Sequence, residues 1–179
     1  MNNLLLYFAK PSEEAKYYIS NVLNPVKFEQ IDSNLFMLAL DDIEIASEAI
    51  KAASQEFYID IAAYIVEAYL PNKFYSYISL YLKEKQNGVF NLADIIEDNV
   101  LKNNVSFKTD FKNYFSSKLS KEVIDTAITF IKTGNSIKAS KELFIHRNTL
   151  NYRIEAIKKV TSLDIKYFKD QLAFYGLFH

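Results

Sequence analysis

The spacing of the apolar residues changes once along the chain, near Pro71, and this change limits the possible folds more than any other feature. Before Pro71, short apolar runs typical of strands alternate with apolar residues repeated every three or four positions, which is typical of helices. After Pro71 only the helical spacing continues. The sequence therefore predicts an α+β chain, with a mixed N-terminal domain followed by an all-α domain.

The N-terminal elements follow the order β-α-β-β-α-β, which predicts a split βαβ sandwich with helices on one face of a sheet. Ser12 is a typical helix cap before two glutamates, whose charge favours the helix dipole. The polar turn Asp32-Ser33-Asn34 separates two apolar runs and predicts a hairpin. The expected ranges are a strand at 4–9, a helix at 12–23, strands at 26–31 and 35–40, a helix opening at Asp41-Asp42 and reaching 53, and a strand at 57–66.

The middle of the chain contains the expected domain boundary, between 86 and 120. Pro71 begins a helix that stops near Asn87-Gly88, and a helical stretch over 92–119 is interrupted around Asn103-Asn104. We therefore expect a first domain over 1–86, a helical linker over 87–119 and a second domain over 120–179.

From Ser120 onward the pattern predicts three consecutive helices. The first, over 121–132, ends before Gly134, which supplies the left-handed residue at which helices often stop. The second is short and is capped by Asn135 or Ser136. Its expected buried residues are Ile137, Ala139 or Ser140, and Leu143. A tight connection over 144–146 leads to the third helix, from 147 to about 160.

The third helix has distinct inner and outer faces at ~100° per residue. The inner face is apolar and consists of Leu150, Ile154, Ile157 and Thr161. The outer face combines amide, hydroxyl and cationic groups with one carboxylate, and consists of Asn148, Thr149, Asn151, Tyr152, Glu155 and Lys159. Such groups suit base edges and phosphates in a major groove. An ordinary helical hairpin with a polar outer face fits the periodicity equally well.

Charge is unevenly distributed along the chain. Residues 121–179 hold ten Lys/Arg against six Asp/Glu, a balance of +4, whereas residues 1–120 hold 11 against 16, a balance of −5. A basic module on an acidic body suits a polyanionic partner, because each phosphate contact releases condensed counterions. A solvated basic face explains the same distribution.

Composition excludes several functional classes. The chain has no cysteine and three glycines, which excludes disulfides, thiolate chemistry and a phosphate-cradling loop. The chain has only two histidines, His146 and His179, and no cysteine, so the residues needed for a catalytic triad or a zinc site are missing. We therefore expect no metal, no cofactor and no enzyme activity. No apolar run reaches the ~18 residues of a membrane span and no signal peptide is recognisable, so we expect a cytoplasmic protein without membrane contact.

A specific motif lies at residues 135–154, which read NSIKASKELFIHRNTLNYRI. This string closely resembles the C-terminal helix-turn-helix of the PucR/CdaR family of regulators, and residues 143–150 with Tyr152-Arg153 match it almost letter for letter. The resemblance extends over roughly 120–178, with Ser162 in place of the usual glycine. It implies a sequence-specific, DNA-binding transcription regulator.

The resemblance also implies roles for individual residues. The groove-facing residues would be Arg147, Asn148, Thr149, Asn151 and Tyr152. His146 would cap the helix or reach a phosphate, and Arg153 would contact a phosphate or form a structural ion pair. The remaining candidate DNA contacts are Lys138, Lys141, Lys159 and Ser136, the last being better suited to capping. A homodimer on double-stranded DNA is expected, because one such helix reads only a half-site.

The N-terminal order of elements resembles the degenerate GGDEF-like domain that precedes the helix-turn-helix in many PucR/CdaR proteins. Active diguanylate cyclases carry Gly-Gly-Asp/Glu-Glu-Phe on their central hairpin, whereas the corresponding residues 32–36 contain no glycine and one carboxylate. We therefore expect a catalytically inactive domain.

Usual family members are longer and place a sensory domain before this region, for which we expect no room in the present chain. A small-molecule effector or a partner protein acting on residues 1–90 is one expectation, and no effector is another. Two alternative functions stay open, namely a protein-interaction adaptor that has lost DNA contact and a nucleotide-dependent cyclase.

Overall fold

The computed structural model describes residues 2–67 and 70–179, which fold into two compact units. The first unit ends at Leu92 and the second begins at Ala93. Within the described residues, all strands belong to the first unit and the second unit is helical. The predicted α+β class, with an all-α C-terminal part, is confirmed. None of the helices formed by the described residues is long and apolar enough to cross a lipid bilayer.

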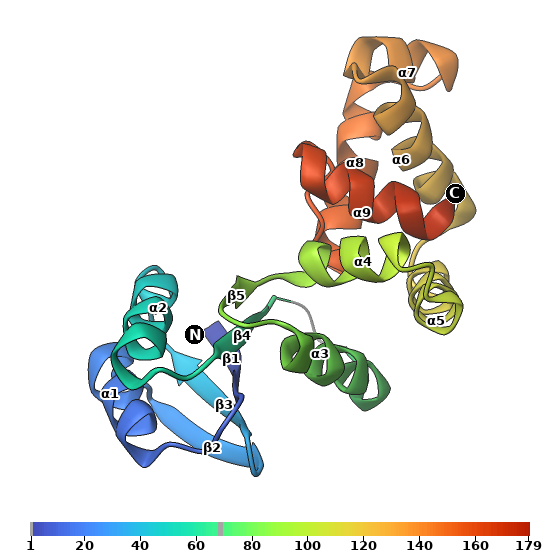
Figure 1. The fold of residues 1–179 in the computed structure, drawn as a ribbon. Coiled ribbons are helices and arrows are strands. Elements are labelled where there is room, and N and C mark those ends of the chain that lie inside the picture. The colour runs from blue at the N-terminus through green and yellow to red at the C-terminus, as the bar shows by residue number, and fades with distance from the viewer. Residues whose placement is uncertain (1, 68–69) are drawn as a thin grey trace. The chain divides into compact units, whose positions relative to one another are not determined.

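The first unit has the predicted β-α-β-β-α-β order, followed by one more helix and one more strand (Figure 1). The elements are β1 (Asn2–Phe8), α1 (Glu13–Leu23), β2 (Lys27–Asp32), β3 (Leu35–Leu40), α2 (Ala46–Phe57), β4 (Ile61–Val66), α3 (Asn72–Glu84) and β5 (Gly88–Phe90). They form a five-stranded sheet in the order β2-β3-β1-β4-β5. Central β1 is antiparallel to both β3 and β4, and β5 is parallel to β4.

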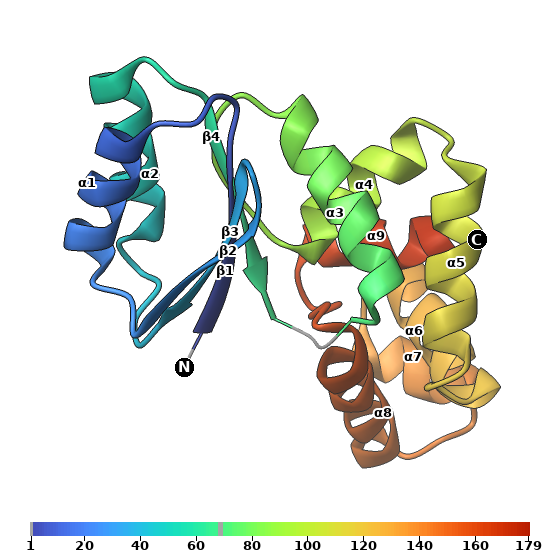
Figure 2. The ribbon, with the colours of Figure 1, turned by 90° about the horizontal axis from the view of Figure 1, so that it is seen from below.

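Alternate side chains of β1 face opposite sides of this sheet. Leu4 and Leu6 belong to the buried core that also contains Ile19 of α1 and Ile50 of α2. Figure 2 shows α1 and α2 side by side on this face, as their mutual contacts require. Leu5 lies between Leu4 and Leu6 and therefore faces the other side, where α3 contacts β1 and β4.

Two boundaries in the first unit differ from the sequence expectation. The second helix begins at Ala46 rather than at Asp41-Asp42, because the Asp42 carboxylate accepts the N–H of Glu44 at 2.8 Å and closes a local turn. Phe57 is the last residue of α2, and Tyr58 follows it with a left-handed φ of 52°. The next strand therefore begins at Ile61, not at residue 57.

The second unit begins at the second residue of α4 (Leu92–Leu101) and continues with α5 (Val105–Ser116), α6 (Lys121–Thr133), α7 (Ser136–Glu142), α8 (Arg147–Thr161) and α9 (Phe168–Phe178). The break between α4 and α5 falls where the sequence predicts it. There, the side chain of Asn104 caps α5 by accepting the N–H of Phe107 at 3.1 Å.

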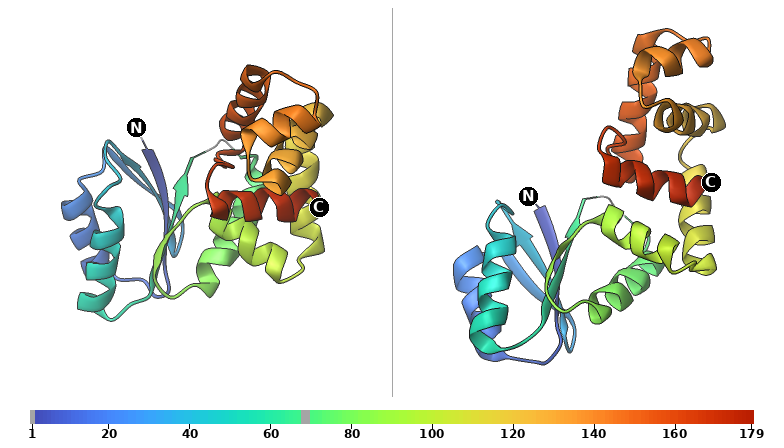
Figure 3. Two further views of the ribbon diagram at one scale, coloured as in Figure 1. Left: turned by 90° about the horizontal axis from the view of Figure 1, so that it is seen from above. Right: turned by 45° about the horizontal axis from the view of Figure 1, so that its top comes forward.

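Residues 87–119 do not form the expected linker. Gly88–Phe90 is a strand that pairs with β4, so the preceding residues belong to the first unit. Helix α4 packs so closely against α9 that a Cβ on Gly176 would lie 2.8 Å from Cγ1 of Val100. Lys169 of α9 also pairs with Asp94 of α4, and α4 and α9 run side by side (Figure 1, Figure 3). Helix α5, with Phe107, Phe111 and Phe115 all buried, contacts α9 as well.

Candidate nucleic-acid interface

The turn that precedes α7 is set by two consecutive residues. Gly134 ends α6 with a left-handed φ of 60°, a conformation that costs glycine little because it has no Cβ. Asn135 then caps α7, its Oδ1 accepting the N–H groups of Ile137 at 2.8 Å and Lys138 at 3.1 Å. Of the two expected caps, Asn135 is therefore the actual one, and Ser136 is the first residue of the helix.

Helix α7 packs through Ala139 and Ser140, which are both buried. Ile137, which the sequence predicts as buried, is 54% exposed. The helix has only seven residues, so only one narrow side of it contacts α6 and α8. Ile137 lies outside that side.

The connection from α7 to α8 is tight. Phe144 adopts a left-handed φ of 53° and is 96% exposed. The N–H of Ile145 donates to the carbonyl oxygen of Ser140 at 3.0 Å, and Nδ1 of His146 accepts the N–H of Asn148 at 3.2 Å. His146 is thus the N-cap of α8, which is one of its two expected roles.

Helix α8 has the two faces that the sequence predicts. Leu150, Ile154, Ile157 and Thr161 are buried, and α8 contacts α6 and α7. The opposite side carries exposed polar residues near the start of the helix, namely Arg147, Asn148, Thr149, Asn151 and Tyr152. Across residues 2–67 and 70–179, the side chains of these five residues have no hydrogen-bond or ion-pair partner.

Three lysines extend this exposed polar surface. Lys138 and Lys141 of α7 and Lys159 of α8 are all exposed, and within the described part of the chain their ammonium groups have no carboxylate partner. Together with Arg147 they form the cationic groups of the surface. We call these eight residues the α7–α8 polar surface: Lys138, Lys141, Arg147, Asn148, Thr149, Asn151, Tyr152 and Lys159.

Arg153 is turned away from this surface. Its Nη1 donates to Oγ1 of Thr126 on α6 at 3.0 Å, and Thr126 is fully buried. A hydrogen bond from Ser120, and more weakly the charge of Arg153, hold the pKa of Glu122 below its usual value. Arg153 therefore joins α8 to α6 through a hydrogen bond, rather than through the ion pair that was one of its two expected roles.

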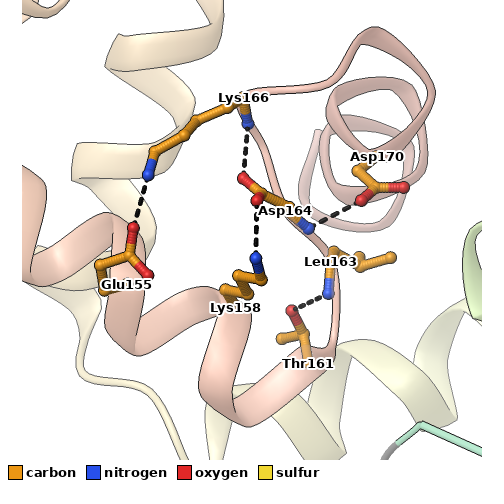
Figure 4. A network of polar contacts seen from close by, with 7 residues as sticks. All are labelled: Glu155, Lys158, Thr161, Leu163, Asp164, Lys166 and Asp170. Atoms are coloured by element: carbon orange, nitrogen blue, oxygen red, sulfur yellow. Dashed lines mark hydrogen bonds and ion pairs between the residues drawn. The ribbon is translucent and has the colours of Figure 1, made fainter.

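A group of charged side chains forms hydrogen bonds and ion pairs around the C-terminal end of α8 (Figure 4). Lys158 pairs with Asp164 at 2.9 Å, and the carboxylate of Asp164 also accepts the N–H of Lys166 at 3.2 Å. Partial burial opposes ionisation of Asp164, but these hydrogen bonds hold the pKa of Asp164 below its usual value. Burial raises the pKa of Asp170, which accepts the N–H of Asp164 at 2.7 Å.

This charged group affects the outer face of α8 in two ways. Glu155 is the one carboxylate that the sequence places on that face, and it pairs with Lys166. Its negative charge is therefore offset at the surface. Lys158 is occupied by Asp164, so Lys159 is the basic residue of this helix end that stays exposed without a carboxylate partner among the described residues.

In the hairpin between β2 and β3, the carboxylate of Asp32 accepts the N–H of Ser33 at 2.7 Å. Within residues 2–67 and 70–179, no group of three or more His, Cys, Asp or Glu side chains is placed to hold a metal ion.

Three comparisons show which known proteins the chain is similar to, and the family match lies within the second unit. Residues 123–176 match the PucR C-terminal helix-turn-helix domain. The chain is 51% identical over 39 residues, 22% of its length, to the carbohydrate diacid regulator of Escherichia coli (strain K12). It is 39% identical over 57 residues, 31% of its length, to the proline-responsive transcriptional activator PutR of Bacillus subtilis (strain 168). The matched segments are only 10% and 14% of the lengths of these two proteins.

Among solved structures, the regulator of polyketide synthase expression from Bifidobacterium adolescentis is similar with a TM-score of 0.49 and 14% sequence identity, over 98% of this chain and 77% of that one. The match to the domain confirms the resemblance that the sequence shows: residues 123–176 are a helix-turn-helix domain of the PucR C-terminal type.

Proposed function

We propose that this protein is a transcription regulator that binds specific sequences of double-stranded DNA through α8. The observation that carries the proposal is the α7–α8 polar surface, whose side chains are exposed and have no partner within the described chain. A PucR-type helix-turn-helix and the regulators that share it support the same function.

In this proposal α8 enters the major groove and its first two turns read the bases. Asn148 or Asn151 offers an amide that can pair with adenine, and Arg147 offers a guanidinium for guanine or phosphate. Thr149 can contact the thymine methyl group. Tyr152 is 76% exposed and offers a ring and a hydroxyl at the same surface.

The proposed phosphate contacts come from α7 and from the C-terminal end of α8. Lys138, Lys141 and Lys159 are cationic and exposed, so they can approach the backbone on either side of the groove. Ser136 and His146 stay further candidates for phosphate contact. Arg153 contributes indirectly, because its hydrogen bond to Thr126 fixes α8 on α6.

A homodimer belongs to the same proposal. One recognition helix contacts only a half-site, and two copies related by a two-fold axis double the contacts on a palindromic site. A location in the cytoplasm, with the chromosome, follows from this proposal.

Selection of bound duplexes from a random pool by the purified chain tests the function directly. We expect an enriched palindrome, and the distance between its halves gives the spacing of the two helices. Failure to enrich any sequence with a folded protein would favour the interaction adaptor.

Arg147→Glu tests the groove assignment, with Lys118→Glu as the matched control. Both residues are exposed in the second unit and both variants change the charge by the same amount, but Lys118 lies outside α7 and α8. We expect Arg147→Glu to abolish specific binding in a mobility-shift assay and Lys118→Glu to preserve it. Equal losses in the two variants would contradict the assignment.

A further inference from the structure

Phe144, in the turn between α7 and α8, combines an unfavourable backbone conformation with an exposed ring. Its φ of 53° lies in the left-handed region, which a bulky side chain rarely adopts and which suits glycine or asparagine. The side chain is 96% exposed, so burial of the ring does not offset this cost. The fold of the turn therefore gives no reason for a phenylalanine, and residues in such conformations cluster at functional sites.

Phe144 adjoins the α7–α8 polar surface. Its N–H donates to the carbonyl oxygen of Lys141 at 3.2 Å, and Arg147 follows it by three residues, which span at most ~11 Å of chain. Lys141 and Arg147 both belong to that surface, and neither has a carboxylate partner in the part of the chain that the structure describes. An exposed apolar ring therefore lies close to two exposed cations of the kind that contact DNA phosphates.

The chemistry of the ring limits what it can contact on DNA. A phenylalanine side chain has no conventional hydrogen-bond donor or acceptor, so it suits neither a phosphate oxygen nor the polar edge of a base. The apolar group that a base presents in the major groove is the C5 methyl group of thymine, which phenylalanine can contact. Residues near the start of a recognition helix reach the base edges, and Phe144 precedes the first residue of α8 by three positions.

We propose that Phe144 determines specificity by packing against the methyl group of one thymine in each half-site. This inference rests on the proposed binding of DNA through α8, and it adds a base contact from the turn before that helix. Backbone conformation and exposure alone do not define the role, because Tyr58 of the first unit has a φ of 52° and is 93% exposed. The position of Phe144 beside Lys141 and Arg147 defines it.

Uracil substitution tests the contact with the full chain and the duplex that the wild-type protein selects from a random pool. Uracil differs from thymine only by lacking the methyl group, so each thymine of one half-site is replaced in turn and the Kd is measured. We expect the wild-type protein to lose about fourfold in affinity at the thymine that Phe144 contacts. In Phe144→Gly the same replacement should change affinity by less than about 1.5-fold, whereas a thymine contacted by Thr149 should stay sensitive in both proteins.

Stability and affinity of Phe144→Gly should change in opposite directions. Glycine adopts a left-handed φ at little cost, so we expect Tm to rise by about 2–4 °C while affinity for the selected duplex falls about tenfold. Tyr58→Gly is the matched control, because it relieves the same backbone conformation outside the helix-turn-helix. It should raise Tm without changing affinity. A purely structural role of Phe144 would move Tm and affinity in the same direction.

The outcomes separate this inference from the proposed function. If the wild-type protein binds its selected duplex, two results would overturn the inference alone: an unchanged affinity of Phe144→Gly, or a uracil effect of equal size in both proteins at every thymine. A selected half-site without thymine would overturn it as well. A folded wild-type protein that selects no duplex would contradict the proposed function and this inference together.

Discussion

Replacing Arg153 by methionine separates the two roles that an arginine at this position can have, fixing α8 on α6 or contacting DNA. Methionine keeps most of the apolar stem and removes the guanidinium. The substitution therefore removes the 3.0 Å hydrogen bond from Nη1 to Oγ1 of Thr126. A hydrogen bond with a charged donor contributes ~1.5–3 kcal/mol. Because Arg153 is only half-buried, solvent weakens this contribution, and we expect a loss of about 1–2 kcal/mol in the free energy of unfolding.

Thermal and chemical denaturation measure this loss. For a chain of this size, 1 kcal/mol corresponds to roughly 2–4 °C in Tm, so we expect Arg153→Met to melt several degrees lower. A double-mutant cycle with Thr126→Val isolates the pair. It is needed because the hydroxyl of Thr126 also donates to the carbonyl oxygen of Glu122 at 2.6 Å. We expect a coupling energy of about 1 kcal/mol between the two positions.

DNA affinity, measured for Arg153→Met and for the matched variant Arg147→Met, distinguishes the two roles. Arg147 is exposed and without a partner in the described chain, so we expect its loss to change stability by less than about 0.5 kcal/mol. It should weaken binding and reduce the slope of log affinity against log salt by about one. Arg153→Met should leave that slope unchanged. A variant Arg153→Met with the wild-type Tm and a reduced salt slope would refute this reasoning.

Three further substitutions test contacts at the ends of α7 and α8. Ser162→Gly should raise the free energy of unfolding by about 1 kcal/mol in a urea titration, because Ser162 ends α8 with a left-handed φ of 60° that favours glycine; an unchanged midpoint would contradict this. Asn135→Ala should lower it by about 1 kcal/mol, because two N–H groups of α7 lose their acceptor, and Asn135→Ser should retain most of the stability. Asp164→Asn should destabilise the protein at pH 7. Since the pKa of Asp164 is lowered from 3.8 in the folded protein, the stabilisation is present above about that pH and disappears as the pH falls through the folded-state pKa. Thermal melts of both proteins between pH 7 and pH 2 measure the difference, and a constant difference would argue against an ionic role.

The strongly periodic elements could be predicted from sequence because local spacing determines them. The inner face of α8 is the clearest case, since Leu150, Ile154 and Ile157 repeat with the helical period and are buried as predicted. The strand β5 could not be found in this way. It has three residues, too few to show a period, and it exists because β4 offers it a parallel partner.

Contacts between distant segments were beyond sequence reasoning. The partner of Arg153 lies 27 residues away on α6, and only the packing of α6 against α8 brings the two side chains together. The start of α2 was misplaced for a local reason, because an Asp in the first helical turn and an Asp that closes a turn look alike in sequence. The GGDEF-like nature of the first unit and the DNA contacts stay predictions.

Gly176 of α9 leaves no room for a side chain against Val100 of α4, so these two helices have complementary surfaces. A truncated chain that starts at residue 120 would lack α4 and α5, and the apolar side of α9 would be exposed to water. Anyone transplanting this module into a chimaera should cut ahead of α4, and should keep α4 and α9 from the same parent.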